Sequence, residues 1–95
     1  MTGQLAFEWD VDKARRNIEK HNVAFEEAAT VFDDPMFITF IDEEHSLDEE
    51  RYITLGLSSK GRLLMLAHAD RKGRIRIISA RRATKKEEQF YVQAK

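Results

Sequence analysis

The most distinctive chemical feature of the chain is a run of basic side chains near its carboxyl end. Residues 71–86 include eight basic residues and no acidic one. Arginine forks match the oxygens of a phosphate at two points, and aromatic rings stack on unpaired bases. The pattern predicts a nucleic-acid-binding surface built from Arg51, Arg74, Arg76, Arg81, Arg82, Lys85 and Lys86, with the rings of Tyr52 and Tyr91.

This basic run is part of a strong charge asymmetry along the chain. Residues 1–50 hold four Lys or Arg against fourteen Asp or Glu, and residues 51–95 hold twelve against three. The halves therefore carry −10 and +9, although the whole chain carries only −1. Two interpretations follow: a basic face binds a polyanion, or the two halves neutralise each other across the folded surface.

Other site chemistries find little support in the sequence. The absence of cysteine excludes disulfides and thiolate metal sites. His21, His45 and His68 do not share a helical metal-binding spacing. The acidic stretch around His45, residues 42–50, could hold a divalent ion, but such loops are usually only solvated. We expect His68 in the core or at a sheet edge, and we expect neither a metal nor a cofactor.

Hydrophobic spacing predicts the elements that position the basic surface. A short strand at 5–9 precedes a helix that Asp10 caps and that ends near His21. A second amphipathic helix follows at 25–32 and ends before Pro35. Four strands are then expected at 36–41, 51–57, 62–69 and 73–81.

A last helix completes the chain, and Thr84 with Glu87 is expected to form its capping box. The predicted order is β-α-α-β-β-β-β-α in one domain, residues 1–95. Strands joined by hairpins predict an antiparallel sheet with the helices packed on one face, an α+β fold.

Strict alternation in the strand at 73–81 predicts which way its basic residues point. It places Ile75, Ile77, Ser79 and Arg81 on one face, and Arg74, Arg76, Ile78 and Ala80 on the other. The Arg81 stem would then lie on a packed apolar surface and present its guanidinium at the sheet edge.

The sequence shows no membrane or export signal. No apolar run approaches the roughly 20 residues of a membrane span, and residues 1–10 lack a basic start followed by an apolar core. We therefore expect a cytoplasmic protein with no membrane partner.

Several sequence blocks resemble the BrnT toxins of type II toxin–antitoxin systems. The blocks are FEWD (Phe7–Asp10), Asn17, Lys20-His21, FEEA (Phe25–Ala28), Phe32–Pro35, His45-Ser46, EERY (Glu49–Tyr52) and IRIISARRAT (Ile75–Thr84) with Glu87 and Tyr91. They cover nearly the whole chain, in the order of the family. This chain departs from the family at Asn22 and Ala24, where Gly and Ser are common, so Ala24 lacks a helix-capping side chain.

The resemblance implies a RelE-like fold and RNA cleavage that stops translation. It also implies a BrnA-type antitoxin with a ribbon-helix-helix domain as partner, and contact with operator DNA only through the antitoxin complex.

Metal-independent cleavage would use the RNA 2′-hydroxyl as nucleophile, together with a base, an acid and cations for the charge on phosphorus. We expect Arg51 and Arg81 to stabilise that charge, and Lys20 and His21 to transfer protons or orient the substrate. Further RNA contacts are expected from Arg74, Arg76, Arg82, Lys85, Lys86 and Tyr91. Structural ion pairs for the arginines, and simple helix capping for Lys20 and His21, remain open. So does a non-catalytic module that binds nucleic acid or a partner through the basic strand–helix edge.

Overall fold

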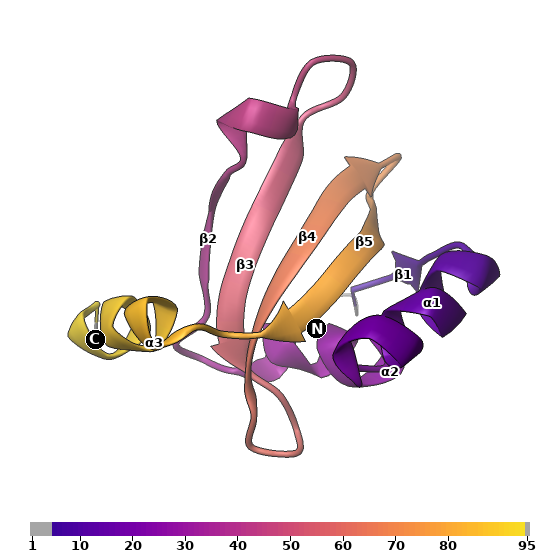
Figure 1. Cartoon of the computed structure of the whole chain (residues 1–95). Helices are drawn as coiled ribbons and strands as arrows, with labels where there is room; N and C mark the ends of the chain where they lie inside the picture. Colours follow the sequence, from indigo (N-terminus) through magenta and orange to yellow (C-terminus); the bar gives the residue numbers. More distant parts are fainter. Residues whose placement is uncertain (1–4, 95) are drawn as a thin grey trace.

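The structure is a computed structural model and describes residues 5–94. One sheet carries three α-helices and two short 3₁₀ helices (Figure 1). In chain order the elements are β1 (Phe7–Glu8), α1 (Val11–His21), α2 (Phe25–Ala29), η1 (Thr30–Asp33), β2 (Ile38–Ile41), η2 (Glu43–His45), β3 (Arg51–Leu57), β4 (Leu63–Arg71), β5 (Arg74–Arg82) and α3 (Lys85–Gln93). The predicted α+β class is confirmed.

The sheet is mixed, which corrects the prediction of an antiparallel one. Its strand order is β1-β5-β4-β3-β2. The four strands from β2 to β5 are antiparallel neighbours, as their hairpin connections predict. The short β1, however, runs parallel to β5, with Phe7 opposite Ile75. Two residues of extended chain give little sequence signal for their direction.

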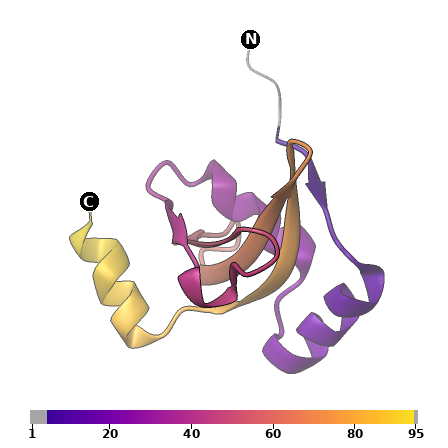
Figure 2. The same ribbon diagram turned by 90° about the horizontal axis from the view of Figure 1, so that it is seen from above.

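The helices lie on both faces of the sheet, so the prediction of one helical face is wrong. Figure 2 shows α1 and α2 on one side and α3 on the other. The main core lies between α2 and the sheet, where Phe25, Ala28 and Val31 pack with Leu64 and Leu66. On the opposite face, Ile38 and Phe40 of β2 meet α3. Burial on two faces follows from the apolar residues on both sides of β2 and β3.

A β-bulge in β5 changes the faces predicted for its basic residues. His68 pairs with Ile77 and Ala67 pairs with Ser79, so Ile78 has no opposite residue. Both Ile77 and Ala80 are consequently buried in the core, at 1% exposure each. The register places Arg81 opposite Met65, on the α3 face and away from Ile77, which corrects the predicted alternation.

The helix ends follow local sequence chemistry. The Asp10 carboxylate accepts a hydrogen bond from the Lys13 backbone N–H, which confirms it as the N-cap of α1. Asn22 ends that helix in the left-handed conformation with φ 58°. Thr84 and Glu87 form the predicted capping box of α3. Ala24 precedes α2 without a side-chain cap, as its residue type dictates.

Candidate nucleic-acid interface

The strand β5 divides the basic run of the sequence between two ends of the sheet. Arg74 begins the strand and Arg82 ends it. The eight steps along the strand from one to the other, at about 3.3 Å each, separate them by roughly 26 Å. The cations at 71–76 therefore lie beside the acidic segment at 42–50, and those at 81–86 lie at the opposite end (Figure 1). The nucleic-acid-binding residues predicted from sequence do not form one surface.

At the first end, most of the arginines are paired with carboxylates. Glu8 binds Arg74 and Arg76, each at 3.2 Å, and these contacts fix the short β1 against β5. Arg71 lies 3.4 Å from Glu49. These pairs support the structural interpretation of the arginines, in which acidic residues from the first half neutralise basic residues from the second.

Arg51 also lies at this end, on the same face of the sheet as Arg76, since both pair with Ala69 in neighbouring strands. It makes no ion pair among residues 5–94, so the structural pairing considered for it does not form there. Its side chain lines a shallow pocket with Glu44, His45 and Glu49. A polyanion would meet repulsion from these carboxylates.

Arg81 is held by α3 and does not meet Arg51. Its two terminal nitrogens each lie 2.9 Å from one oxygen of Glu87. Hydrogen bonding to Glu87 raises the pKa of Arg81, and hydrogen bonding from Arg81 lowers the pKa of Glu87 despite partial burial. The guanidinium therefore anchors the first turn of α3. Glu87 occupies the two-point geometry that phosphate oxygens would take.

Cations without an ion pair lie on both faces of the sheet at its second end. We call this group the basic end; its members come from α1, the β3–β4 hairpin, the end of β5 and the start of α3. All are exposed except His21, which is half-buried, and none makes an ion pair within residues 5–94. The basic end comprises Lys20, His21, Lys60, Arg82, Lys85 and Lys86.

Two buried polar contacts hold these elements together. The first is Asn17 of α1, whose amide donates to the Ala80 carbonyl at 2.8 Å and accepts from the Ala80 N–H at 3.1 Å. The side chain thus replaces a neighbouring strand beyond the end of β1. His21 lies one helical turn after Asn17 on the same helix face. One turn spans about 5.4 Å, nearly two strand residues, so we expect His21 level with Arg82.

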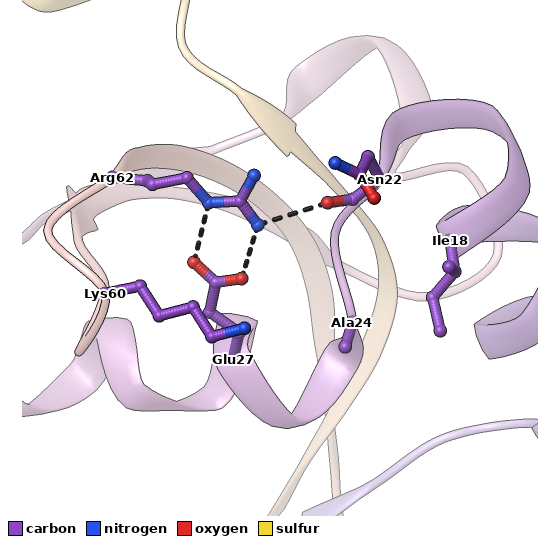
Figure 3. A pocket seen from close by; sticks show the side chains of 6 residues that line it. All are labelled: Ile18, Asn22, Ala24, Glu27, Lys60 and Arg62. Atoms are coloured by element: carbon purple, nitrogen blue, oxygen red, sulfur yellow. Dashed lines mark hydrogen bonds and ion pairs between the residues drawn. The ribbon is translucent and has the colours of Figure 1, made fainter.

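The second contact joins α2 to the β3–β4 hairpin (Figure 3). The carboxylate of Glu27, only 4% exposed, accepts hydrogen bonds from both Nε and Nη2 of Arg62 and from Ser58. Arg62 also donates to the Asn22 carbonyl at 3.1 Å, which ties the end of α1 to the same hairpin. Hydrogen bonding to Arg62 lowers the pKa of Glu27, against the effect of burial. This pair positions Lys60 near the end of α1, in the pocket that Figure 3 shows.

Tyr91 does not offer its ring to a nucleic-acid base. It is 5% exposed, and its hydroxyl donates to Asp34 at 2.6 Å. Burial and this carboxylate raise the pKa of the phenol to about 12. The residue fastens α3 to the segment before β2.

The remaining histidines have structural surroundings. His68 is buried, as expected, with its Nε2 2.6 Å from the Thr54 hydroxyl, and burial lowers its pKa to about 4. His45 lies 2.9 Å from Asp42. Residues 5–94 contain no group of three or more potential metal ligands, so the divalent-ion alternative at the acidic segment gains no support.

The sequence pattern did not predict Lys60 as a member of the basic end, or Arg62 as the residue that holds its hairpin. Lys60 lies in a hairpin turn and Arg62 beside it, and neither belongs to the basic run. Only the antiparallel pairing of β3 and β4 brings that turn to the end of β5. Within residues 5–94, no helix has the length and apolar composition needed to cross a bilayer.

Comparison with known proteins agrees with this architecture. The sequence model described as the BrnT ribonuclease toxin of type II toxin–antitoxin systems matches residues 9–87. The 1.1 Å crystal structure of the Brucella abortus ribonuclease toxin BrnT has a similar fold, with a TM-score of 0.66 and 18% sequence identity. That match covers 86% of this chain and 100% of the other. No match was found among curated proteins. Since the family match spans most of its length, the chain belongs to the BrnT family of type II ribonuclease toxins.

Proposed function

We propose that this protein is an RNA endonuclease toxin that binds and cleaves RNA at the basic end without a metal ion. The observation that carries the proposal is the contrast between the two ends of the sheet. Arg71, Arg74 and Arg76 are paired with carboxylates at one end, whereas the six members of the basic end make no ion pair within residues 5–94. Beside them, Arg62 and Arg81 are paired with Glu27 and Glu87. When exposed cations without an ion pair neutralise phosphates, the counterions condensed on the RNA are released, which favours RNA binding at the basic end.

The chemistry proposed is attack of a 2′-hydroxyl on the adjacent phosphorus. A base takes the hydroxyl proton, the P–O5′ bond breaks, and an acid protonates the departing oxygen, which leaves a 2′,3′-cyclic phosphate. His21 is the proposed proton-transfer group, because an imidazole both accepts and donates a proton near neutral pH. Lys20, its neighbour in α1, and Arg82, which we expect level with it, would stabilise the charge that builds on phosphorus.

Arg81 is retained as a phosphate contact. It leaves β5 at the same end as Arg82, and its carboxylate partner already occupies a two-point site suited to phosphate oxygens. In this proposal an RNA phosphate replaces the Glu87 carboxylate on one side of the Arg81 guanidinium. Arg51 is not part of the proposed site, because its side chain lies in the acidic pocket at the far end of the sheet.

The family resemblance supports finer parts of the proposal. Cleavage in the manner of RelE-like toxins would arrest translation, and the protein would act in the cytoplasm. A BrnA-type antitoxin with a ribbon-helix-helix domain would neutralise it, and the complex would contact operator DNA through that domain. A type II system implies a protein antitoxin and an RNA target for its family.

Two lysines in hairpin turns allow a direct binding test. Lys60 and Lys72 are both exposed residues in hairpin turns, at opposite ends of the sheet. We expect Lys60→Gln to weaken RNA binding and to reduce the slope of log affinity against log salt by about 0.7 to 0.9, the value for one lost phosphate contact. Lys72→Gln should leave both unchanged. Equal effects of the two substitutions, measured by fluorescence anisotropy over a salt series, would argue against the basic end as the RNA site.

A further inference from the structure

Exposed apolar side chains concentrate along one edge of the molecule. Six large apolar residues that are 39–60% exposed come from β2, the segment before it, and α3. We call them the β2–α3 patch: Met36, Phe37, Phe40, Ile41, Phe90 and Val92. Phe40 and Phe90 are in ring contact on the α3 face of the sheet, whereas the next residue of β2, Ile41, points to the other face. Apolar surface shared by neighbouring elements marks an interaction site more often than scattered single residues do.

The patch contains a groove between β2 and α3. Its walls are Ile38, Phe40 and Phe90, and Lys86 and Glu87 lie at its rim. The groove has a volume of about 520 Å³. The rings of Phe40 and Phe90 are 6.2 Å apart and nearly perpendicular, so they form a defined wall that apolar side chains can contact.

The backbone of β2 offers hydrogen-bonding groups beside this groove. β2 is the outermost strand and pairs only with β3 among the described strands. The Asp42 N–H donates to the Arg51 carbonyl at 2.8 Å. Every second residue before Asp42, namely Phe40 and Ile38, therefore directs its backbone groups toward β3. The N–H and C=O groups of Thr39 and Ile41 therefore point outward, where an added strand would meet them.

Charge decides which partner fits. Asp33 precedes β2 and Glu43 and Glu44 follow it; all three are exposed, and none makes an ion pair within residues 5–94. A two-fold pairing of β2 with its copy would be antiparallel and would set Asp33 against Glu43 and Glu44 of the second molecule. RNA would meet the same carboxylates. A basic polypeptide segment avoids both repulsions.

We propose that β2 and the groove bind an extended segment of the antitoxin, added as a sixth strand. Every second residue of this segment would be apolar, and these side chains would fill the groove against Phe40 and Phe90. Lys or Arg residues on both sides of this apolar part would face Asp33 at one end and Glu43 and Glu44 at the other. The inference rests on the proposed function for the existence of an antitoxin. The surface adjoins the basic end at Lys86, on the rim of the groove, but its apolar walls, Ile38, Phe40 and Phe90, are not members of that end.

The test uses the full chain and the purified antitoxin encoded in the same operon. Phe40→Asp and Phe90→Asp place a charge in the groove, and Ile41→Pro removes an outward N–H while leaving the bonds to β3 in place. Val11→Asp is the matched control, since Val11 is 75% exposed at the start of α1, outside the patch. We expect each groove variant to lose antitoxin affinity by on the order of 10²-fold, as central apolar contacts do. Val11→Asp should change it less than threefold.

Each variant is also checked by thermal melting, by RNA cleavage in the absence of antitoxin, and by sedimentation. Wild-type antitoxin affinity in folded Phe90→Asp and Ile41→Pro would overturn the proposal. Groove variants that lose RNA binding but keep antitoxin binding would also overturn it. A wild-type protein that self-associates, and that Phe40→Asp makes monomeric, would overturn it too. Cleavage by the wild-type protein alone tests the proposed function separately, so failure of the docking site and failure of the nuclease are distinguishable.

Discussion

The Glu27–Arg62 pair leads to a quantitative prediction, because it joins the hairpin, α2 and the end of α1. Arg62→Met would leave the Glu27 carboxylate, 4% exposed, with Ser58 as its remaining side-chain hydrogen-bond donor and Lys60 as the remaining nearby cation. Breaking a buried ion pair by removing one partner costs about 3 to 5 kcal/mol. We expect about 3 kcal/mol, the lower limit of that range, because the Arg62 side chain is 22% exposed and water can partly reach the site.

A loss of that size would lower the melting temperature by roughly 12 to 24 °C for a domain of this length. Arg16→Met is the matched control, because Arg16 is an exposed arginine on α1 with no ion pair within residues 5–94. The double variant Glu27→Leu/Arg62→Met should regain most of the stability, since it leaves no uncompensated charge. Urea unfolding of the four proteins would measure these differences.

The pH dependence provides a second check on the same pair. Arg62 lowers the pKa of Glu27 below the ordinary value of a glutamate, so the stabilisation is present above that ordinary pKa and is lost as pH falls through the folded pKa. The deficit of Arg62→Met should therefore shrink in acid. A deficit no larger than that of Arg16→Met, or one that persists unchanged when Glu27 is protonated, would refute the reasoning.

Three further perturbations test other parts of the account. Burial lowers the pKa of His68 from 6.5 to about 4, so the wild-type protein should lose up to roughly 3 kcal/mol of stability as pH falls from 6.5 to 4. His68→Gln should remove this loss, as measured by urea unfolding at several pH values. Equal pH profiles of the two proteins would exclude His68 as its cause. Arg81→Ala and Glu87→Gln each break the partly exposed Arg81–Glu87 pair and should each cost about 1 kcal/mol of stability. Only Arg81→Ala should also slow RNA cleavage, by on the order of 10²-fold. Equal cleavage rates in the two folded variants would remove Arg81 from the site. Gly56→Ala would bring a Cβ within 2.7 Å of Val31 and should destabilise the protein by about 1 to 3 kcal/mol; an unchanged melting temperature would show that η1 shifts without cost.

Local chemistry made the helix ends and most strands predictable from sequence. Asp10, Thr84 and Glu87 satisfy backbone groups within their own first turns, so nearby residues suffice to identify them. Alternating apolar residues similarly indicated β3 and β4. The bulge at Ile78 left no comparable signal, because a β-branched residue suits a regular strand and a bulge alike. One extra residue was enough to move Arg81 to the other face.

The candidate site depended on long-range pairing that the sequence does not display. Glu8 and Arg76 are 68 residues apart, and their contact removes Arg76 from the cations free to meet a ligand. Asn17 reaches Ala80 over 63 residues and sets the position of α1. An extended strand also spreads a cluster of charges along its length, so basic residues that are close in sequence lie far apart in space. The basic end could be recognised only once β5 had a register and partners.

Cleavage of a labelled single-stranded RNA by the purified protein in the presence of EDTA tests the proposed nuclease most directly. We compare the wild-type protein with His21→Gln and with Lys72→Gln, which alters an exposed cation at the opposite end of the sheet. The proposal predicts metal-independent cleavage by the wild-type protein and by Lys72→Gln, products that end in a 2′,3′-cyclic phosphate, and a loss on the order of 10²-fold or more in folded His21→Gln. Wild-type cleavage by His21→Gln, or cleavage that EDTA abolishes, would contradict it.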